Sequence, residues 1–493
     1  MTENYHNTTS PLYNGASDTI CALSTAIGGA LAIIRVSGEK AISITDKVFR
    51  AANKKSLSEA SPNTLHFGEI YDLENTVIDE VMISLYRAPH SFTGENSIEI
   101  SCHGSRFIIQ QILKTLIDNG CRQANPGEYT QRAYLNGKMD LSQAEAVADL
   151  IESTNRATHK LAMGQLKGNF TSELSSLREQ LLKITSLIEL ELDFSDQDVT
   201  FADRQELLDL ASHIRNKISS LAHSFETGKA IKSGIPVAII GKTNVGKSTL
   251  LNALLHEDKA IVSDIHGTTR DVIEDTTDIN GITFRFIDTA GIRKTEDKIE
   301  NLGIERTFQK LNEATIVLWL LDEQPSEEEE ARMREQTLDK KFIKVYNKID
   351  LLHPSGDHLA GPIDAVSSDI RQHPSSTSSD FSSINDEEVT TVYISAKHGT
   401  NLTLLEEAIY KAANIPEITE NDIIVTNARH YEALTHALES INRVIEGLNG
   451  QLSGDLLSED LRICLDQLAE ITGGQITSTE VLHNIFKNFC IGK

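Results

Sequence analysis

The chain has 493 residues, 39% of them hydrophobic and 24% charged, which is typical of a soluble globular protein of about three domains. It lacks an apolar run of the roughly 18 residues that a transmembrane helix needs, and the polar segment Met1–Ser17 lacks the features of a secretory signal. The net charge of −26 excludes a broad basic surface for nucleic acid, so an RNA substrate needs a local basic patch or a partner protein. The five cysteines form no CxxC pair, which indicates reduced thiols in the cytoplasm; they are Cys21, Cys102, Cys121, Cys464 and Cys490.

The N-terminal part of the chain mixes short apolar runs with turns. Ala30–Val36 and Ser97–Ile100 have the composition of strands, and Phe107–Ile117 has the character of a helix. We therefore predict an α+β domain over residues 1–137.

The next part has helical character. Residues 138–229 lack proline, and the apolar residues of Leu174–Leu192 recur every three or four positions. The same character returns after Pro416, in His430–Leu448 and Glu459–Phe489. We predict one discontinuous all-α helical domain, built from residues 138–229 and 414–493, into which residues 230–413 are inserted.

The inserted residues alternate strand-like and helix-like stretches, as in a doubly wound α/β domain. The run around Trp319 is predicted to be a buried strand, and the acidic run Glu327–Glu330 the solvated face of a helix. Leu351–Glu388 is rich in Ser, Asp, His and Pro and is predicted to be a disordered insertion.

A phosphate-binding loop lies at the start of this domain. Gly241–Ser248 matches the pattern G-x-x-x-x-G-K-[ST] and stands between the apolar run Val237–Ile240 and the helix-like Thr249–Leu255. Backbone N–H groups of such a loop face phosphate oxygens, Lys247 would reach the β- and γ-phosphates, and Ser248 would offer a hydroxyl to Mg²⁺. The predicted fold class is therefore multidomain α/β, with a Ras-like P-loop domain inserted into the helical domain.

Three further motifs, each after a strand-like run, indicate GTP as the nucleotide. Asp288–Gly291 suits the surroundings of Mg²⁺ and a γ-phosphate contact. Asn347–Asp350 has the NKxD pattern of GTPases, in which Asp350 accepts from the N1 and N2 donors of guanine that adenine lacks. Ser395–Lys397 matches the third loop that contacts guanine.

A switch segment is predicted between the phosphate loop and Asp288. Gly267–Asp271 contains two threonines, and we assign Thr269 as the one that closes on Mg²⁺ when the γ-phosphate is bound. The spacing alone suits Thr268 equally well.

The position after Asp288–Gly291 departs from Ras-type GTPases, which place there a glutamine that orients the attacking water. This chain has Ile292, which cannot do so. Hydrolysis therefore needs another group. The candidates are a switch carboxylate such as Glu300, or a monovalent cation held by an oxygen of Asn244.

These residues resemble the MnmE (TrmE) family of tRNA-modification GTPases over nearly the whole chain. The motifs that carry the resemblance are Gly241–Ser248, Gly267–Asp271, Asp288–Gly291, Ala124–Tyr129, Asp140–Ala146 and Phe489–Lys493. The last of them ends in Cys-Ile-Gly-Lys, which is the most diagnostic because ordinary GTPases do not end in this way.

The resemblance implies a homodimer formed through the N-terminal domain, which binds a tetrahydrofolate derivative, either 5-formyl- or 5,10-methylene-tetrahydrofolate. It implies G domains that associate across the dimer when potassium and GTP are bound. It also implies a heterotetramer with MnmG (GidA), a partner that carries FAD. This complex would add a (carboxymethyl)aminomethyl group to C5 of the wobble uridine of certain tRNAs, with the folate as one-carbon donor.

The resemblance also assigns residues by motif position. The catalytic residue would be Glu300, which positions water indirectly; Ser248 and Thr269 would bind Mg²⁺; and the potassium ligands would be Asn244, Ser263, Ile265 and Thr268. The folate contacts would be Arg35, Glu99, Lys138 and Lys493. The GTP contacts would be Asn244, Val245, Gly246, Lys247, Ser248, Thr249, Ser263, Asp264, Ile265, His266, Gly267, Thr268, Thr269, Asp288, Thr289, Ala290, Gly291, Asn347, Lys348, Asp350, Ser395, Ala396 and Lys397.

Two other functions fit part of the sequence. A regulatory GTPase switch, for example in ribosome assembly, would need no modification chemistry, but the folate-type domain and the C-terminal motif argue against it. A stand-alone folate-dependent transferase would leave the complete guanine site unexplained. Cys490, beside Lys493, is either a chemical nucleophile or a buried core thiol near the folate pocket, which is the commoner role of a free cysteine.

Overall fold

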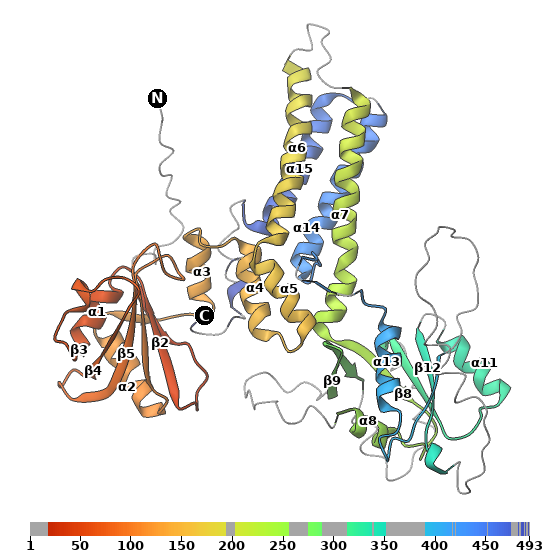
Figure 1. The fold of residues 1–493 in the computed structure, drawn as a ribbon. Helices are drawn as coiled ribbons and strands as arrows, with labels where there is room; N and C mark the ends of the chain where they lie inside the picture. Colours follow the sequence, from red (N-terminus) through yellow and green to blue (C-terminus); the bar gives the residue numbers. More distant parts are fainter. Residues whose placement is uncertain are drawn as a thin grey trace. The chain divides into compact units, whose positions relative to one another are not determined.

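The computed structural model describes residues 18–193, 203–255, 275–287, 313–337, 340–351, 390–416, 418–419, 421–450, 452–474, 482, 485–487, 489 and 492. The chain divides into two compact units (Figure 1). The first comprises Met1–Ser153, His159–Phe225 and Thr419–Lys493, and the second comprises Thr154–Thr158 and Glu226–Ile418. The domain limits predicted above, after residues 137, 229 and 413, stay predictions.

The first unit contains a seven-stranded sheet of order β3-β4-β5-β6-β2-β1-β7, antiparallel except where β1 and β7 pair. Its strands are β1 Thr19–Leu23, β2 Leu31–Ser37, β3 Phe49–Ala51, β4 Thr64–Tyr71, β5 Val77–Tyr86, β6 Ser97–His103 and β7 Cys121–Gln123. Its helices are α1 Ala41–Val48, α2 Arg106–Asp118 and α3 Glu128–Leu135. The two strands and the helix predicted in this part of the chain are confirmed as β2, β6 and α2.

One face of this sheet packs on α1 and α2, because alternate strand residues such as Ile34, Ile83 and Ile100 are fully buried with apolar residues of both helices. The other face presents apolar side chains to solvent. Phe67 pairs with Met82 across β4 and β5, and their exposed fractions are 51% and 39%. The main core of this sheet therefore lies between it and helices α1 and α2, and a second, smaller buried cluster is formed by Ile20, Ala22, Ala124 and Tyr129.

Helices α6 Asn169–Asp193, α7 Arg204–Ser233, α14 Ala428–Asn449 and α15 Gly454–Thr472 share one hydrophobic core and run side by side (Figure 1). Most of the buried residues of these helices recur three or four positions apart, as in a coiled coil; in α6 and α14 they include Leu174, Leu177, Leu181, Ile184, Ile188, Leu434, Ala437, Ile441, Val444 and Leu448. The first and second helical segments thus complete one bundle. Among the described residues, no helix is both long and apolar enough to cross a membrane.

The helical character predicted for Glu459–Phe489 is interrupted, because α15 ends at Thr472. Gly473 takes the left-handed conformation with φ 77°, and the N–H of Gly474 donates to the carbonyl of Ala469. Both features form a Schellman stop, for which the Gly-Gly pair was the sequence signal.

A buried ion cluster joins the two helical segments. Arg429 of α14 donates from Nε and Nη2 to the two carboxylate oxygens of Glu145, on α4 (Leu141–Glu152), at 3.0 and 2.9 Å. His430 Nε2 lies 2.6 Å from the same carboxylate, and Arg429 also donates to the carbonyls of Glu470 and Ile471 at the end of α15. Burial raises the pKa of Glu145, but the opposing effects of His430 and Arg429 lower it to about 2.

We predict that Glu145→Gln lowers the free energy of unfolding at pH 7 by about 3 kcal/mol, because it leaves the largely buried guanidinium of Arg429 uncompensated. The folded-state pKa is depressed, so the stabilisation is present above the ordinary pKa of 4.5 and is lost as pH falls towards about 2. Urea denaturation followed by helical circular dichroism, across this pH range, measures both effects. Glu152→Gln, exposed on the same helix, serves as the control, and equal stability of the two variants would contradict the prediction.

The second unit contains a six-stranded sheet of order β13-β12-β11-β8-β10-β9, parallel except where β9 pairs with β10. The strands are β8 Ile235–Ile240, β9 Asp275–Ile279, β10 Ile282–Phe286, β11 Ile316–Leu321, β12 Lys341–Tyr346 and β13 Thr390–Tyr393. The helices are α8 Lys247–Leu255, α11 Glu327–Gln336 and α13 Leu402–Ala413. Trp319 is buried in β11 and α11 buries no residue, which confirms both predictions; the predicted insertion lies outside the described residues from residue 352 onward.

Candidate functional site

The phosphate loop runs from the end of β8 into α8, as predicted. Gly241 and Gly246 have φ of 155° and 100°, which few other residues adopt. A Cβ at Gly241 would lie 2.4 Å from the Leu320 carbonyl oxygen, and one at Gly246 would lie 2.4 Å from Asn347 Nδ2. The loop therefore needs glycine at both positions to sit against its neighbours in the sheet.

Lys247 is folded onto its own loop. Its Nζ donates to the carbonyls of Gly241 and Lys242 at 2.7 and 2.6 Å. Lys242 in turn pairs with Glu329 on α11 at 3.0 Å and with Glu323 at 3.4 Å. The ammonium of Lys247 thus stands inside the loop, where it can reach the phosphate oxygens of a bound nucleotide.

Asn347 joins the three predicted nucleotide loops. Its side chain is 5% exposed; Nδ2 donates to the Val245 carbonyl at 2.9 Å, and Oδ1 accepts from the Ala396 N–H at 3.0 Å. One amide thereby ties the phosphate loop, the NKxD loop and the Ser395–Lys397 loop together. Residues from three separate strand ends are brought to one site, as the sequence predicted.

The carboxylate of Asp350, which is predicted to bind guanine, is held in place by a neighbouring side chain. Ser395 Oγ donates to Asp350 Oδ1 at 2.6 Å, and this hydrogen bond lowers the pKa of Asp350, which is therefore ionised at neutral pH. His398 Nε2 lies 3.7 Å from Asp350 Oδ2. Lys348 pairs with Asp322, directly after β11, at 2.8 Å.

Asp322, Lys242 and His398 were not predicted as site residues. Asp322 could have been found from the sequence, because a polar residue directly after a buried strand is a common site position. Lys242 and His398 could not, because their partners are brought to them only by the fold. Several predicted site residues lie outside the described residues: Ser263–Thr269, Asp288–Gly291, Ile292, Glu300, Cys490 and Lys493.

The predicted folate contacts Arg35 and Glu99 are neighbours on the sheet face opposite α1 and α2. They are register partners on β2 and β6, and Arg35 Nη2 lies 2.7 Å from Glu99 Oε1. Arg35 Nη1 and Ser24 Oγ also donate to the carbonyl of Gly492, at 3.4 and 2.9 Å. Lys138 Nζ donates to the Pro89 carbonyl at 3.0 Å, and the Arg35 guanidinium lies over the Phe92 ring of the same loop.

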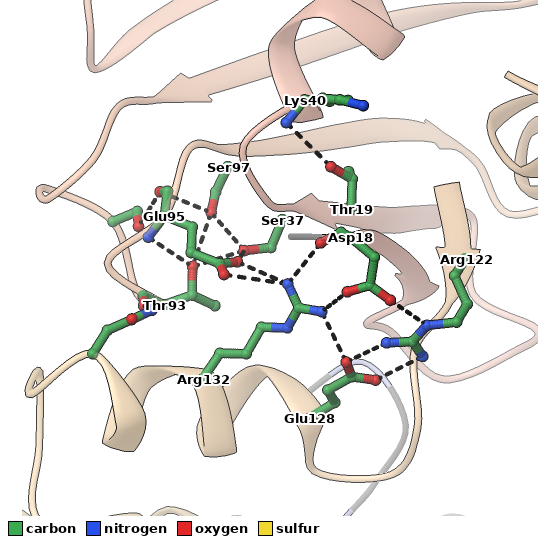
Figure 2. Close-up of polar contacts among 12 residues, drawn as sticks. Asp18, Thr19, Ser37, Lys40, Thr93, Glu95, Ser97, Arg122, Glu128 and Arg132 are labelled. Carbon is green, nitrogen blue, oxygen red and sulfur yellow. Dashed lines mark hydrogen bonds and ion pairs between the residues drawn. The ribbon is translucent and has the colours of Figure 1, made fainter. Parts of the chain in front are cut away.

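A charged network fixes α3 against this sheet (Figure 2). Glu128, 2% exposed, accepts from Arg122 at 2.6 Å and from Arg132 at 2.9 Å, and Arg132 also pairs with Asp18 and Glu95. Burial raises the pKa of Glu128, but hydrogen bonds from Arg122, the Asn125 N–H and Arg132 outweigh it and keep the pKa lowered.

The residue after Glu128 connects this network to Arg35. Tyr129 is fully buried, and its hydroxyl donates to the Arg35 carbonyl at 2.7 Å. The Ala124–Tyr129 motif therefore acts structurally: it anchors α3 and positions the strand that carries Arg35.

We predict that Asp350→Asn weakens GTP binding by about 100-fold or more, since charge-assisted hydrogen bonds contribute about 1.5–3 kcal/mol each. Binding of xanthosine triphosphate should improve, because its C2 oxygen accepts from the new amide. Equilibrium binding of fluorescent nucleotides measures both affinities. Glu407→Gln, exposed on α13, is the matched control; unchanged GTP affinity in Asp350→Asn would contradict the assignment.

A parallel sheet with a phosphate loop after β8 and two guanine-type loops after β12 and β13 defines a P-loop GTPase domain, here inserted between the two segments of a helical domain. Comparison with known proteins identifies the domains on either side of the GTPase domain as well. Residues 141–490 match the MnmE helical domain, and residues 19–138 match the GTP-binding protein TrmE N-terminus.

Two curated relatives match over nearly the full length of the chain. The tRNA modification GTPase MnmE of Phocaeicola vulgatus is 55% identical over 514 aligned residues, which cover 97% of this chain and 99% of the relative. That of Bacteroides thetaiotaomicron is 56% identical over 481 residues with the same coverage. The chain belongs to the MnmE family of tRNA modification GTPases.

Among solved structures, the G domain of the T. maritima FeoB iron transporter matches with 22% identity and a TM-score of 0.23, covering 36% of this chain and 98% of that one. So low a score supports no inference about function. The family membership rests on the full-length relatives.

Proposed function

We propose that this GTPase depends on potassium and, with an FAD-dependent partner of the MnmG (GidA) kind, adds a (carboxymethyl)aminomethyl group to C5 of the wobble uridine of certain tRNAs. The methylene carbon would come from a tetrahydrofolate derivative, 5-formyl- or 5,10-methylene-tetrahydrofolate, and FAD would be carried by the partner only. The observation that carries the proposal is the coexistence, in one member of the MnmE family, of a preformed guanine site and of the Arg35–Glu99 pair beside Gly492.

The proposed GTP site is the set of residues predicted from the motifs. Backbone N–H groups and Lys247 would bind the phosphates, Asp350 and the Ser395–Lys397 loop would bind guanine, and Ser248 and Thr269 would hold Mg²⁺. Glu300 would position the attacking water, because Ile292 has no group that can.

The proposed potassium ligands are Asn244, Ser263, Ile265 and Thr268. Of these, Asn244 is exposed in the phosphate loop and has a φ of 63°, so its amide oxygen is accessible to a cation beside the nucleotide. A monovalent cation there would stabilise the charge that develops on the transferred phosphoryl group, where an arginine acts in other GTPases.

The proposed folate site uses Arg35, Glu99, Lys138 and Lys493. Both hydrogen bonds from Arg35 fall on Glu99 Oε1, and Oε2 has no hydrogen bond among the described residues. A carboxylate oxygen in this position can accept from the N–H groups of a pterin ring, and the cationic residues can pair with the glutamate tail. Cys490 would lie near this pocket as a buried core thiol and would not act as the nucleophile.

The proposed assembly is a homodimer through the N-terminal domain, joined by the partner in a heterotetramer in the cytoplasm. The uncovered sheet face supports the dimer, because Leu65, Phe67 and Met82 are 68%, 51% and 39% exposed on it. Such an apolar face is stabilised by a second copy. We also propose the domain limits given above, with folate binding and dimerisation in residues 1–137.

We predict that GTP hydrolysis by the full chain is about 10–100-fold faster in KCl than in NaCl of equal ionic strength, the size expected for removing one transition-state charge partner. Asn244→Gly keeps the backbone conformation but removes the amide oxygen, so it should abolish the difference. Asn414→Gly, which also replaces an asparagine of positive φ, at the end of α13, is the matched control. Equal rates in the two salts would refute the potassium site.

We predict that tRNA from a strain lacking this protein loses the modified wobble uridine, which mass spectrometry of tRNA nucleosides measures directly. A plasmid copy should restore it, and a copy with Arg35→Met should not. Unchanged nucleosides in the deletion strain would favour the regulatory GTPase switch over the modification chemistry.

A further inference from the structure

The short segment Thr154–Thr158 is the unexpected part of the second unit. It lies in the sequence between residues of the first unit, Ser153 and His159, yet it groups with the inserted domain. It contains the start of α5, Arg156–Leu166. One helix therefore begins in the second unit and continues in the first.

The segment is bound to the hairpin of β9 and β10. Asn155, 8% exposed, donates from Nδ2 to Thr283 Oγ1 at 2.8 Å. The N–H of Ala157, in the first turn of α5, donates to the Gly281 carbonyl at 3.0 Å. This N–H has no acceptor within its own helix, and the carbonyl of the hairpin serves as the acceptor instead.

The orientation of the Asn155 amide is fixed from both ends. Its Oδ1 accepts from the Thr158 N–H at 2.8 Å, which caps α5, and this leaves Nδ2 for Thr283. The hydroxyl of Thr158 also donates to the Asn155 carbonyl at 3.0 Å. The same side chain thus caps the helix and binds the strand.

The hairpin has a tight turn, is fully paired, and lies close to the first turn of α5. Asn280 and Gly281 have φ of 54° and 82°, as in a type I′ turn, and β9 pairs with β10 along its whole length. A Cβ at Gly281 would lie 3.0 Å from the Cβ of Arg156. The turn thus lies close to the first turn of α5, and the two are joined by the hydrogen bonds of Ala157 and Asn155.

The hairpin also connects the two predicted nucleotide-sensing segments. The chain enters β9 from the segment that contains Thr269, and it leaves β10 towards Asp288. The hairpin therefore lies in the sequence between the two segments proposed to respond to the γ-phosphate.

The remainder of α5 is held in the first unit. Leu161 and Ala162 are buried there, Gln165 Nε2 donates to the Ser142 carbonyl at 2.8 Å, and Gln143 of α4 donates to the Leu166 carbonyl at 3.0 Å. The same helix therefore contacts the β9–β10 hairpin at its first turn and α4, which also carries Glu145, at its later residues.

We propose that the Asn155–Thr283 contact couples the nucleotide state to the helical domain, with Asn155 and Thr283 as positioning residues that touch neither nucleotide nor folate. The proposal rests on the switch role proposed above for Thr269 and Asp288. In this proposal the nucleotide-dependent change reaches the helical domain through the Asn155–Thr283 hydrogen bond and helix α5.

The test uses the full-length chain with one fluorophore in each unit, and records energy transfer without nucleotide and with a non-hydrolysable GTP analogue in KCl. Thr283→Val removes the hydroxyl and keeps the β-branched shape. We expect it to lose at least half of the nucleotide-dependent change and to slow wobble-uridine modification, with the partner present, by about 5–10-fold. Its GTP hydrolysis and melting temperature should stay close to those of the unaltered chain.

Two further variants keep the proposal falsifiable. Thr283→Ser retains the hydroxyl and should restore the signal, and Thr276→Val makes the same substitution at an exposed site on β9 and should have no effect. A full nucleotide-dependent change in Thr283→Val overturns the coupling, as does the absence of any change in the unaltered chain. The potassium proposal is judged separately, by the hydrolysis rates of the same preparations in KCl and NaCl.

Discussion

The carboxylate of Glu145 is the constraint on which the first unit depends. A buried carboxylate is tolerated only when its charge is paired and its oxygens are hydrogen-bonded. Both partners, Arg429 and His430, belong to the helical segment that follows the inserted domain in the sequence. The second helical segment is therefore held in one register against the first. Because Arg429 also binds the last carbonyls of α15, the same interaction determines where the C-terminal segment departs from the bundle.

The described residues of the C-terminal segment contact both α4 and the N-terminal sheet. Leu482 and Phe486 pack with Leu141 and Ala144, and the Gly492 carbonyl ends beside Arg35. The strand that carries Arg35 is thus contacted by residues near the opposite end of the chain. The charged network of Glu128 supports the same strand, since α3 supplies Tyr129, whose hydroxyl donates to the Arg35 carbonyl.

Local patterns predicted most of the fold, and long-range contacts account for what they missed. The phosphate and guanine loops were predictable because each stands at the end of an apolar strand, and the bundle helices because their apolar residues recur at three and four positions. The end of α15 was missed although Gly473-Gly474 marks it, since the apolar pattern continues beyond it. No local pattern places Thr154–Thr158 with the inserted domain, reveals Lys242 paired with α11, or shows that Asn347 bridges two other loops, because these depend on sheet order.

The acidic helix α11 has a consequence for how nucleotide reaches its site. It begins with four consecutive glutamates, buries none of its residues, and pairs with the phosphate loop through Lys242. In a chain of net charge −26, this places acidic side chains beside the phosphate loop, where they repel a triphosphate. Long-range electrostatics therefore slows the encounter rather than steering it, so that added salt speeds association. Affinity then comes from contacts made after arrival: oriented backbone N–H groups, the ammonium of Lys247 and the accompanying Mg²⁺.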